Sequence, residues 1–163
     1  MSERRVNNIS IEGARILFRN LAGKPDKFNP KGSKRTFSIL LEEDVATKLM
    51  EDGWNIKPLQ SRDPEDPPRY HLPVEAKFGD YPPNVFLIVG NHKTKLDEDT
   101  IGSLDYAEIQ NVDIIVQPYT WAVRDKAGIK AYVKNMYVTI VENEFEKKYR
   151  DYDEGDSEED FPF

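Results

Sequence analysis

The chain has 163 residues, of which 38% are hydrophobic and 33% are charged, and its formal net charge is −7. This length fits one domain with a hydrophobic core, and no run approaches the ~18 consecutive apolar residues that a membrane span needs. The absence of cysteine excludes disulfide scaffolds, zinc–thiolate sites and cysteine nucleophiles. The first residues lack the apolar segment of a secretory signal, so we expect a cytoplasmic protein.

The predicted elements are mostly short apolar strands separated by turn-rich loops. The pattern from Val6 to Leu21 predicts a long strand with a bend at Gly13. Residues 45–50 form a predicted short helix that ends near Gly53, and residues 95–104 read as a polar loop. Further strands are predicted over 36–41, 54–57, 70–78, 85–89, 109–123 and 129–141, with a hairpin turn at 124–128 between the last two.

Six or seven strands and one short helix, without βαβ alternation, indicate an all-β barrel or sandwich. The OB-fold, a five-stranded Greek-key barrel that binds oligonucleotides, is one architecture of this size. Periodicity alone leaves an SH3-like barrel and an immunoglobulin-like sandwich open. We assign residues 1–145 to this domain. Residues 146–163 lose apolar periodicity, and we expect them to form a disordered acidic tail.

The negative charge of the chain is confined to its C-terminal end. Seven of the 30 acidic residues lie within 151–163, where there is no Lys or Arg. The other 23 acidic residues balance the 23 Lys and Arg residues of the rest of the chain. Residues 1–150 are therefore neutral overall, and the net charge of −7 does not argue against a nucleic-acid site on this part of the chain.

Motifs of common enzyme classes are absent from the sequence, including the phosphate-binding and dinucleotide-binding glycine loops and the Gly-x-Ser-x-Gly nucleophile turn. The two histidines, His71 and His92, have no metal-ligand spacing, so we expect no metal site and no cofactor. The acids of 97–99 leave a magnesium-dependent nuclease as an alternative, although a solvated loop is the simpler interpretation. We therefore expect a binding protein without catalytic activity.

A basic segment between the first two strands is a candidate nucleic-acid site. It holds several cations, a single acid and one aromatic ring. Lysines that follow phosphates, with a ring between them for base stacking, are what single-strand binding requires. An ordinary loop whose ring packs under the barrel is the alternative. The candidate residues are Lys24, Lys27, Phe28, Lys31, Lys34 and Arg35.

Aromatic residues of the later strands form a second candidate surface. Gln117, Tyr119 and Trp121 alternate onto one face of a predicted strand, close to Arg124. The polar Gln117 favours a solvent-facing surface on which both rings stack bases, and a core position for the two rings is left open. Trp54 with Lys57 is a weaker version of the same pairing of a ring with a cation.

The sequence also resembles a known group of proteins. Residues 151–163, an acidic run that ends in Phe-Pro-Phe, resemble the tails of bacterial single-stranded DNA-binding proteins and those of the tailed-phage single-stranded DNA-binding proteins. The body is similar to the phage group in the blocks 28–37, 52–57, 96–100, 112–121 and 130–134.

This resemblance implies an all-β, OB-fold-like five-stranded Greek-key barrel with extra strands and one short helix. It implies sequence-independent binding of single-stranded DNA in phage replication or recombination in the host cytoplasm. The tail would recruit replication partners through Asp160, Phe161, Pro162 and Phe163. The insertion at 62–68 and the missing Gly/Gln/Pro-rich linker depart from the bacterial protein, so a monomer or dimer is expected rather than a tetramer. A protein-interaction adaptor without nucleic-acid contact remains the alternative.

Overall fold

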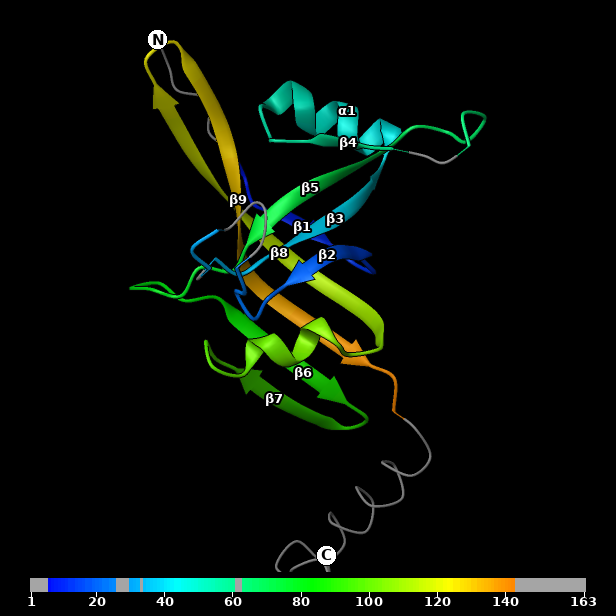
Figure 1. Cartoon of the computed structure of the whole chain (residues 1–163), viewed down its shortest axis with the longest axis vertical. Helices are drawn as coiled ribbons and strands as arrows, with labels where there is room; N and C mark the ends of the chain where they lie inside the picture. The colour runs from blue at the N-terminus through cyan, green and yellow to red at the C-terminus, as the bar shows by residue number, and fades with distance from the viewer. Residues whose placement is uncertain (1–5, 26–29, 33, 61–62, 143–163) are drawn as a thin grey trace, which may run out of the picture.

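The computed structural model describes residues 6–25, 30–32, 34–60 and 63–142. Lys27, Phe28 and the expected tail, with its predicted partner-binding tip, lie outside the described residues. In chain order the elements are β1 (Ile9–Ile11), β2 (Ile16–Asn20), β3 (Thr36–Glu42), α1 (Glu43–Asp52), β4 (Lys57–Leu59), β5 (Arg69–Glu75), β6 (Asn84–Val89), β7 (His92–Leu96), the 3-10 helix η1 (Ile101–Asp105), β8 (Ile109–Val123) and β9 (Lys126–Ile140) (Figure 1).

The sheet is a partly open OB-type barrel, which confirms the predicted fold class. Its strand order is β1-β8-β9-β5-β3-β2, with β5 and β9 parallel and the other contacts on this path antiparallel. β1 and β2 are two halves of one strand that bends at Gly13, where φ is 64°. Directly after the bend, the Ala14 amide donates to the Val112 carbonyl of β8 at 2.8 Å, and the next residue, Arg15, accepts at its carbonyl from the Leu40 amide of β3 at 2.9 Å. The strand therefore joins both ends of the sheet.

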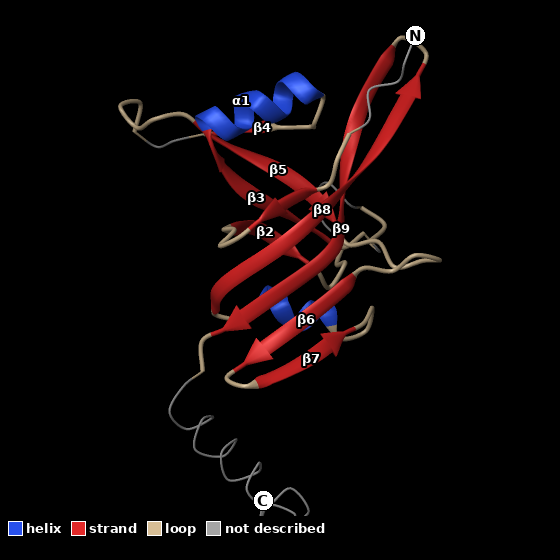
Figure 2. Ribbon diagram, turned by 180° about the vertical axis from the view of Figure 1, so that it is seen from behind, coloured by secondary structure: helices blue, strands red, loops and turns tan. Residues whose placement is uncertain are grey.

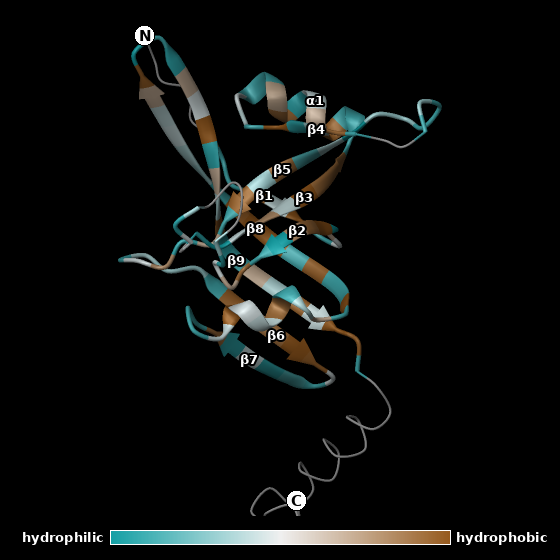
Figure 3. Cartoon of the chain, in the orientation of Figure 1, coloured by the Kyte–Doolittle hydropathy of each residue, from teal (hydrophilic) through white to brown (hydrophobic). Residues whose placement is uncertain are grey.

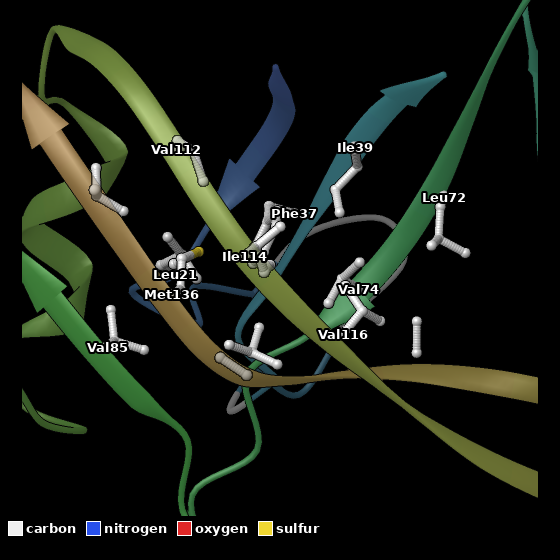
Figure 4. Packing of buried hydrophobic residues seen from close by; sticks show 14 of the residues in the cluster. Leu21, Phe37, Ile39, Leu72, Val74, Val85, Val112, Ile114, Val116 and Met136 are labelled. Carbon is white, nitrogen blue, oxygen red and sulfur yellow. The ribbon is translucent and has the colours of Figure 1, made fainter. Parts of the chain in front are cut away.

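The core lies inside this barrel, where alternate side chains of each strand point inward. Phe37, Val112, Val116 and Met136 are 0–1% exposed. Figure 4 shows these side chains meeting from β3, β8 and β9, with Leu72 and Val74 of β5 beside them. The 3-10 helix η1 adds Ile101 and Leu104, both fully buried. Since one cluster includes residues from nearly every strand, the described barrel is a single packing unit.

Several boundaries differ from the sequence-based expectation. β7 forms within the region between predicted strands because its backbone pairs with β6, although four of its five side chains are exposed and show no apolar alternation. The hydrophilic colour of β7 in Figure 3 shows why hydropathy missed this edge strand. β4 begins at Lys57, since Trp54 makes only an isolated bridge to Ile129. The last hairpin turn is shorter than predicted, because pairing continues to Val123 and Lys126.

Two projections stand at one end of the barrel. Figures 1 and 2 both show the β8–β9 hairpin and the α1–β4 segment at this end, and β6 with β7 at the opposite end. Gly53, with φ of 102°, ends α1 in a left-handed conformation. Its carbonyl accepts a hydrogen bond from the Ile129 amide at 3.1 Å, so the helix end is fixed to the hairpin. None of the described helices is long and apolar enough to cross a bilayer.

Gly13→Ala should destabilise the barrel by about 1–2 kcal/mol, because an L-residue is strained in the left-handed conformation. Space does not limit this substitution, since the nearest atom to an added Cβ is Asn111 Oδ1 at 3.7 Å. Urea unfolding measures the change. Gly79→Ala is the matched control, because its Cβ would meet no atom within 4 Å and its φ is not positive. Equal losses in both variants would contradict the role of the bend.

Candidate nucleic-acid interface

A groove of about 1160 Å³ runs across the outward face of the barrel, between the two projections. Its floor comes from β3 and β5, one wall comes from the β8–β9 hairpin, and the other comes from the segment between α1 and β4. Part of β2 closes one side. The side chains that line the groove include Phe18, Lys34, Ser38, Trp54, Lys57, His71, Glu75, Trp121 and Lys130.

The floor of the groove carries a polar pair on adjacent strands. Ser38 is the only buried polar residue among those that the structure describes, and its Oγ lies 2.9 Å from Nδ1 of His71. The pKa of His71 is lowered, first by burial and then by the positive charge of Lys57. His71 is therefore favoured in its neutral form, whose Nδ1 can donate or accept the hydrogen bond with the serine hydroxyl.

Phe18 is a groove residue that the sequence analysis missed. Its side chain is 64% exposed, and its ring meets His71 edge to face at a centroid distance of 5.3 Å. The backbone explains this position, because φ of Phe18 is 52° and the β2–β3 register shifts between Leu17 and Asn20. Such an irregularity interrupts the alternation of inward and outward side chains along a strand. An apolar run predicts a strand here and gives no signal for this displacement.

Trp121 forms the hairpin wall. It lies opposite Gly128 in the β8–β9 ladder and is 40% exposed. A Cβ added to Gly128 would lie 2.9 Å from Cζ2 and 3.1 Å from Cε2 of the Trp121 ring. The indole therefore lies flat over the glycine, which gives it a fixed orientation without burying it. This is an exposed ring of the kind on which a planar ligand can stack.

Tyr119 lies on the same outward face as Trp121 but outside the groove lining. It is 58% exposed, and its ring meets Tyr132 at a centroid distance of 6.0 Å. The ammonium groups of Lys130 and Lys77 lie 5.1 and 5.8 Å from the centroid of the Tyr132 ring. Lys130 also pairs with Glu75 at 2.8 Å. A cluster of rings and cations therefore borders the groove, and the sequence analysis had named only Tyr119 in it.

The predicted basic loop residues separate into different surroundings. Lys34 lines the groove, whereas Lys31 is exposed outside the lining. Nζ of Lys24 hydrogen-bonds Oη of Tyr106 at 2.8 Å, and this bond raises the pKa of Lys24. Arg35 turns away from the groove: it pairs with Glu98 at 3.6 Å and lies 6.0 Å from the Phe78 ring centroid.

The start of this loop is held against η1 by a carboxylate. The two side-chain oxygens of Asp105 accept hydrogen bonds from the amides of Leu21 and Ala22, at 2.7 and 3.0 Å. The guanidinium of Arg19 donates to the carbonyls of Leu104 and Ala107 at 2.7 and 2.8 Å. The path of the chain leading to Lys24 is thus fixed by contacts with residues more than eighty positions away.

The α1–β4 side of the groove corrects one expectation. Trp54 is 4% exposed and belongs to the core cluster, so it is not an open platform for stacking. An isolated bridge pairs it with Ile129 of β9, and burial of the indole stabilises the fold. Lys57 is exposed and lines the groove, as a phosphate contact requires. Arg124 lies exposed in the hairpin turn, with φ of 58°, and outside the groove lining.

The acidic loop that suggested a magnesium site uses its first carboxylate locally. Oδ1 of Asp97 accepts hydrogen bonds from the Asp99 amide at 2.9 Å and from the Thr100 amide and hydroxyl, both at 3.0 Å. The hydroxyl bond is the main cause of the lowered pKa of Asp97. Among the residues that the structure describes, no three His, Asp or Glu side chains gather in a possible metal site.

Comparisons with known proteins give a family and similar folds. A family model described as "Putative phage ssDNA-binding domain" matches residues 1–160. The single-stranded DNA-binding protein of bacteriophage Enc34, in complex with ssDNA, has a similar fold, with a TM-score of 0.54 and 14% identity over 83% of this chain and 88% of that chain. A second structure of the Enc34 protein gives a TM-score of 0.53 and 14% identity, over 83% and 82% of the two chains. No curated protein sequence is significantly similar.

Gly128→Ala should displace the Trp121 ring while leaving the barrel folded, because the added methyl group would overlap an indole that can rotate into solvent. Acrylamide quenching of tryptophan emission measures this displacement. We expect stronger quenching in Gly128→Ala, and Trp121→Phe should identify which part of the emission comes from this residue. Gly79→Ala is again the control. Unchanged quenching in Gly128→Ala would show that the ring does not depend on the glycine.

Proposed function

The chain belongs to the phage ssDNA-binding domain family, and on this premise we propose that it binds single-stranded DNA, without sequence preference and without catalysis, in the groove between the hairpin and the α1–β4 segment. The observation that carries the proposal is the meeting of two exposed rings, Phe18 and Trp121, with the cations Lys34 and Lys57 on one side of an OB barrel.

The position of the groove supports this assignment. OB-folds bind oligonucleotides on the face of their second and third strands and on the loops that follow the first and fourth. In this chain the corresponding parts are β3, β5, the segment from Leu21 to Arg35 and the β8–β9 hairpin. Of the residues expected from sequence, Lys34 of the basic segment and Trp121 of the later strand line this groove.

The chemistry of the groove suits any base sequence. Every base has a flat face that can stack on Phe18 or Trp121, and each phosphate can be neutralised by a nearby lysine. Bases in a duplex are already stacked on one another, so the same rings favour a single strand. We infer that the protein covers and protects single-stranded DNA in phage replication or recombination, in the cytoplasm of the bacterial host.

The C-terminal residues 151–163 extend the proposal. Their seven acids are tethered to residues 1–150, which are neutral overall, and they compete with DNA phosphates for the cations there. The end of the chain, Asp160 to Phe163, combines a charge with two rings and suits a partner with a basic, apolar pocket. We propose that DNA in the groove displaces the tail, which is then available to replication partners.

Trp121→Ala should weaken binding of oligo-dT by ~1–3 kcal/mol and leave the salt dependence nearly intact, because a stacking surface is lost and no charge is removed. Changing Lys34 and Lys57 together to Ala should instead make the negative slope of log K against log salt less steep by about 1.4, which corresponds to the loss of two phosphate contacts. Fluorescence anisotropy with a labelled oligonucleotide measures both.

Lys48→Ala is the matched charge control, since Lys48 is exposed on α1 outside the groove lining. Equal affinity of the wild-type protein for duplex and single-stranded DNA at moderate salt would contradict the proposed function. So would a protein that binds no oligo-dT, a result that favours the adaptor without nucleic-acid contact.

Removing residues 151–163 should strengthen binding of oligo-dT at low salt, and the gain should shrink as salt rises, because screening limits the competing charges to ~10 Å at 0.1 M. The same anisotropy titrations at several salt concentrations measure the gain. Trimming only Phe161-Pro162-Phe163 removes no charged side chain, so it should leave DNA affinity unchanged and abolish capture of replication partners. A deletion that weakens binding would rule out the competition.

A further inference from the structure

A second pair of rings with a lysine lies outside the groove, at the β6–β7 end of the sheet. Phe86 of β6 and Tyr137 of β9 stack with their centroids 5.2 Å apart and their planes 13° apart. The ammonium group of Lys93, on β7, lies 4.6 Å from the Phe86 centroid and 5.8 Å from the Tyr137 centroid. Both rings are half-buried and Lys93 is exposed.

This ring pair shares the outward face of β9 with the border of the groove. Ala131, Val133 and Met136 point into the core, so Tyr132 and Tyr137 both point outward. The two tyrosines are five residues apart along one strand, roughly 16 Å at 3.3 Å per residue. β5 pairs with β9 as far as Tyr132, and from Asn135 onward β9 pairs with β6 instead. The outward surface is therefore continuous from one tyrosine to the other.

A β-bulge adds a cation between the two tyrosines. The β8–β9 register passes from Val133 to Asn135, which leaves Lys134 as the extra residue of β9. Lys134 is exposed. Along the outward face the order is thus Lys130, Tyr132, Lys134 and Tyr137, with Lys93 beyond. Two acids flank this line. Glu75, opposite Tyr132, pairs with Lys130 at 2.8 Å, and Asp113, opposite Tyr137, accepts a hydrogen bond from the Gly13 amide at 3.0 Å.

We propose that this surface is a second contact site for single-stranded nucleic acid, which leaves the groove past Trp121 and Lys130 and follows β9 to the Phe86–Tyr137 pair. This inference rests on the proposed function of the groove. A base stacks on the ring pair while Lys93 and Lys134 contact phosphates. Continuity with the groove favours a nucleic acid over the chain's own acidic tail, whose chemistry would also suit a lysine beside two rings.

Oligonucleotide length separates the two contact sites. A short oligo-dT of about 5 nucleotides fills the groove alone, whereas one of about 16 nucleotides spans both surfaces, and these lengths bracket the range that single OB-folds occupy. The full-length protein is titrated with each labelled oligonucleotide, as wild type and as the variants Lys93→Ala, Phe86→Leu and Lys48→Ala. Phe86→Leu keeps an apolar side chain in place and removes only the stacking face.

We expect Lys93→Ala and Phe86→Leu each to weaken binding of the long oligonucleotide about tenfold, the loss of one stacking or phosphate contact, and to leave the short one unchanged. Lys48→Ala should change neither. If Phe86→Leu lowers the melting temperature, Lys93→Ala decides, because its side chain is exposed.

Three results would overturn the inference. In the first, Lys93→Ala binds the long oligonucleotide as tightly as the wild-type protein does. In the second, a variant loses affinity for the long and the short oligonucleotide by the same factor. In the third, Lys93→Ala binds the long oligonucleotide more tightly than wild type, which would assign Lys93 to the acidic tail. Failure of the wild-type protein to bind either length would instead contradict the proposed function itself.

Discussion

The antiparallel pairing of β8 with β9 is the interaction on which the rest of the structure depends. Its inward side chains, such as Val116 and Val138, fill the barrel core, and its outward side chains carry the exposed rings. The two strands also extend beyond the barrel, and the end of their hairpin forms a wall of the groove. The β8–β9 ladder continues to Val123 and Lys126, and in this part of the hairpin Trp121 is 40% exposed.

The groove owes its chemistry to places where the regular pattern of the sheet is broken. Phe18 leaves the alternation through a positive φ, and Trp121 lies flat because its partner across the ladder is a glycine. Lys134 is added to β9 by a bulge. Irregular positions of this kind cost stability, and they are common at functional sites because a surrounding fold can hold them. Here the barrel supplies that support, and the rings supply the proposed binding surface.

Charge is distributed so that the cations of the barrel are not equivalent. Arg35 and Lys130 pair with Glu98 and Glu75, whereas Lys57 lines the groove close enough to lower the pKa of His71. The side chains of Arg35 and Glu75 are only 18% and 12% exposed, so these two ion pairs are partly buried and each neutralises one cation. Residues 1–150, which are neutral overall, can therefore present local positive charge, and this reconciles a net charge of −7 with a proposed nucleic-acid site.

The sequence by itself determined the all-β class, the bend at Gly13, the helix ending near Gly53 and the long last hairpin, because period-two alternation, turn residues and caps are local signals. It also named Lys34 and Trp121, which both line the groove. Only the tertiary structure decided which rings are exposed. Trp54 is buried because a distant strand, at Ile129, pairs with it, and Phe18 is exposed because of a register shift. β7 forms because its backbone pairs with β6 at the edge of the sheet. These outcomes depend on partners far apart in the chain, which no local pattern encodes.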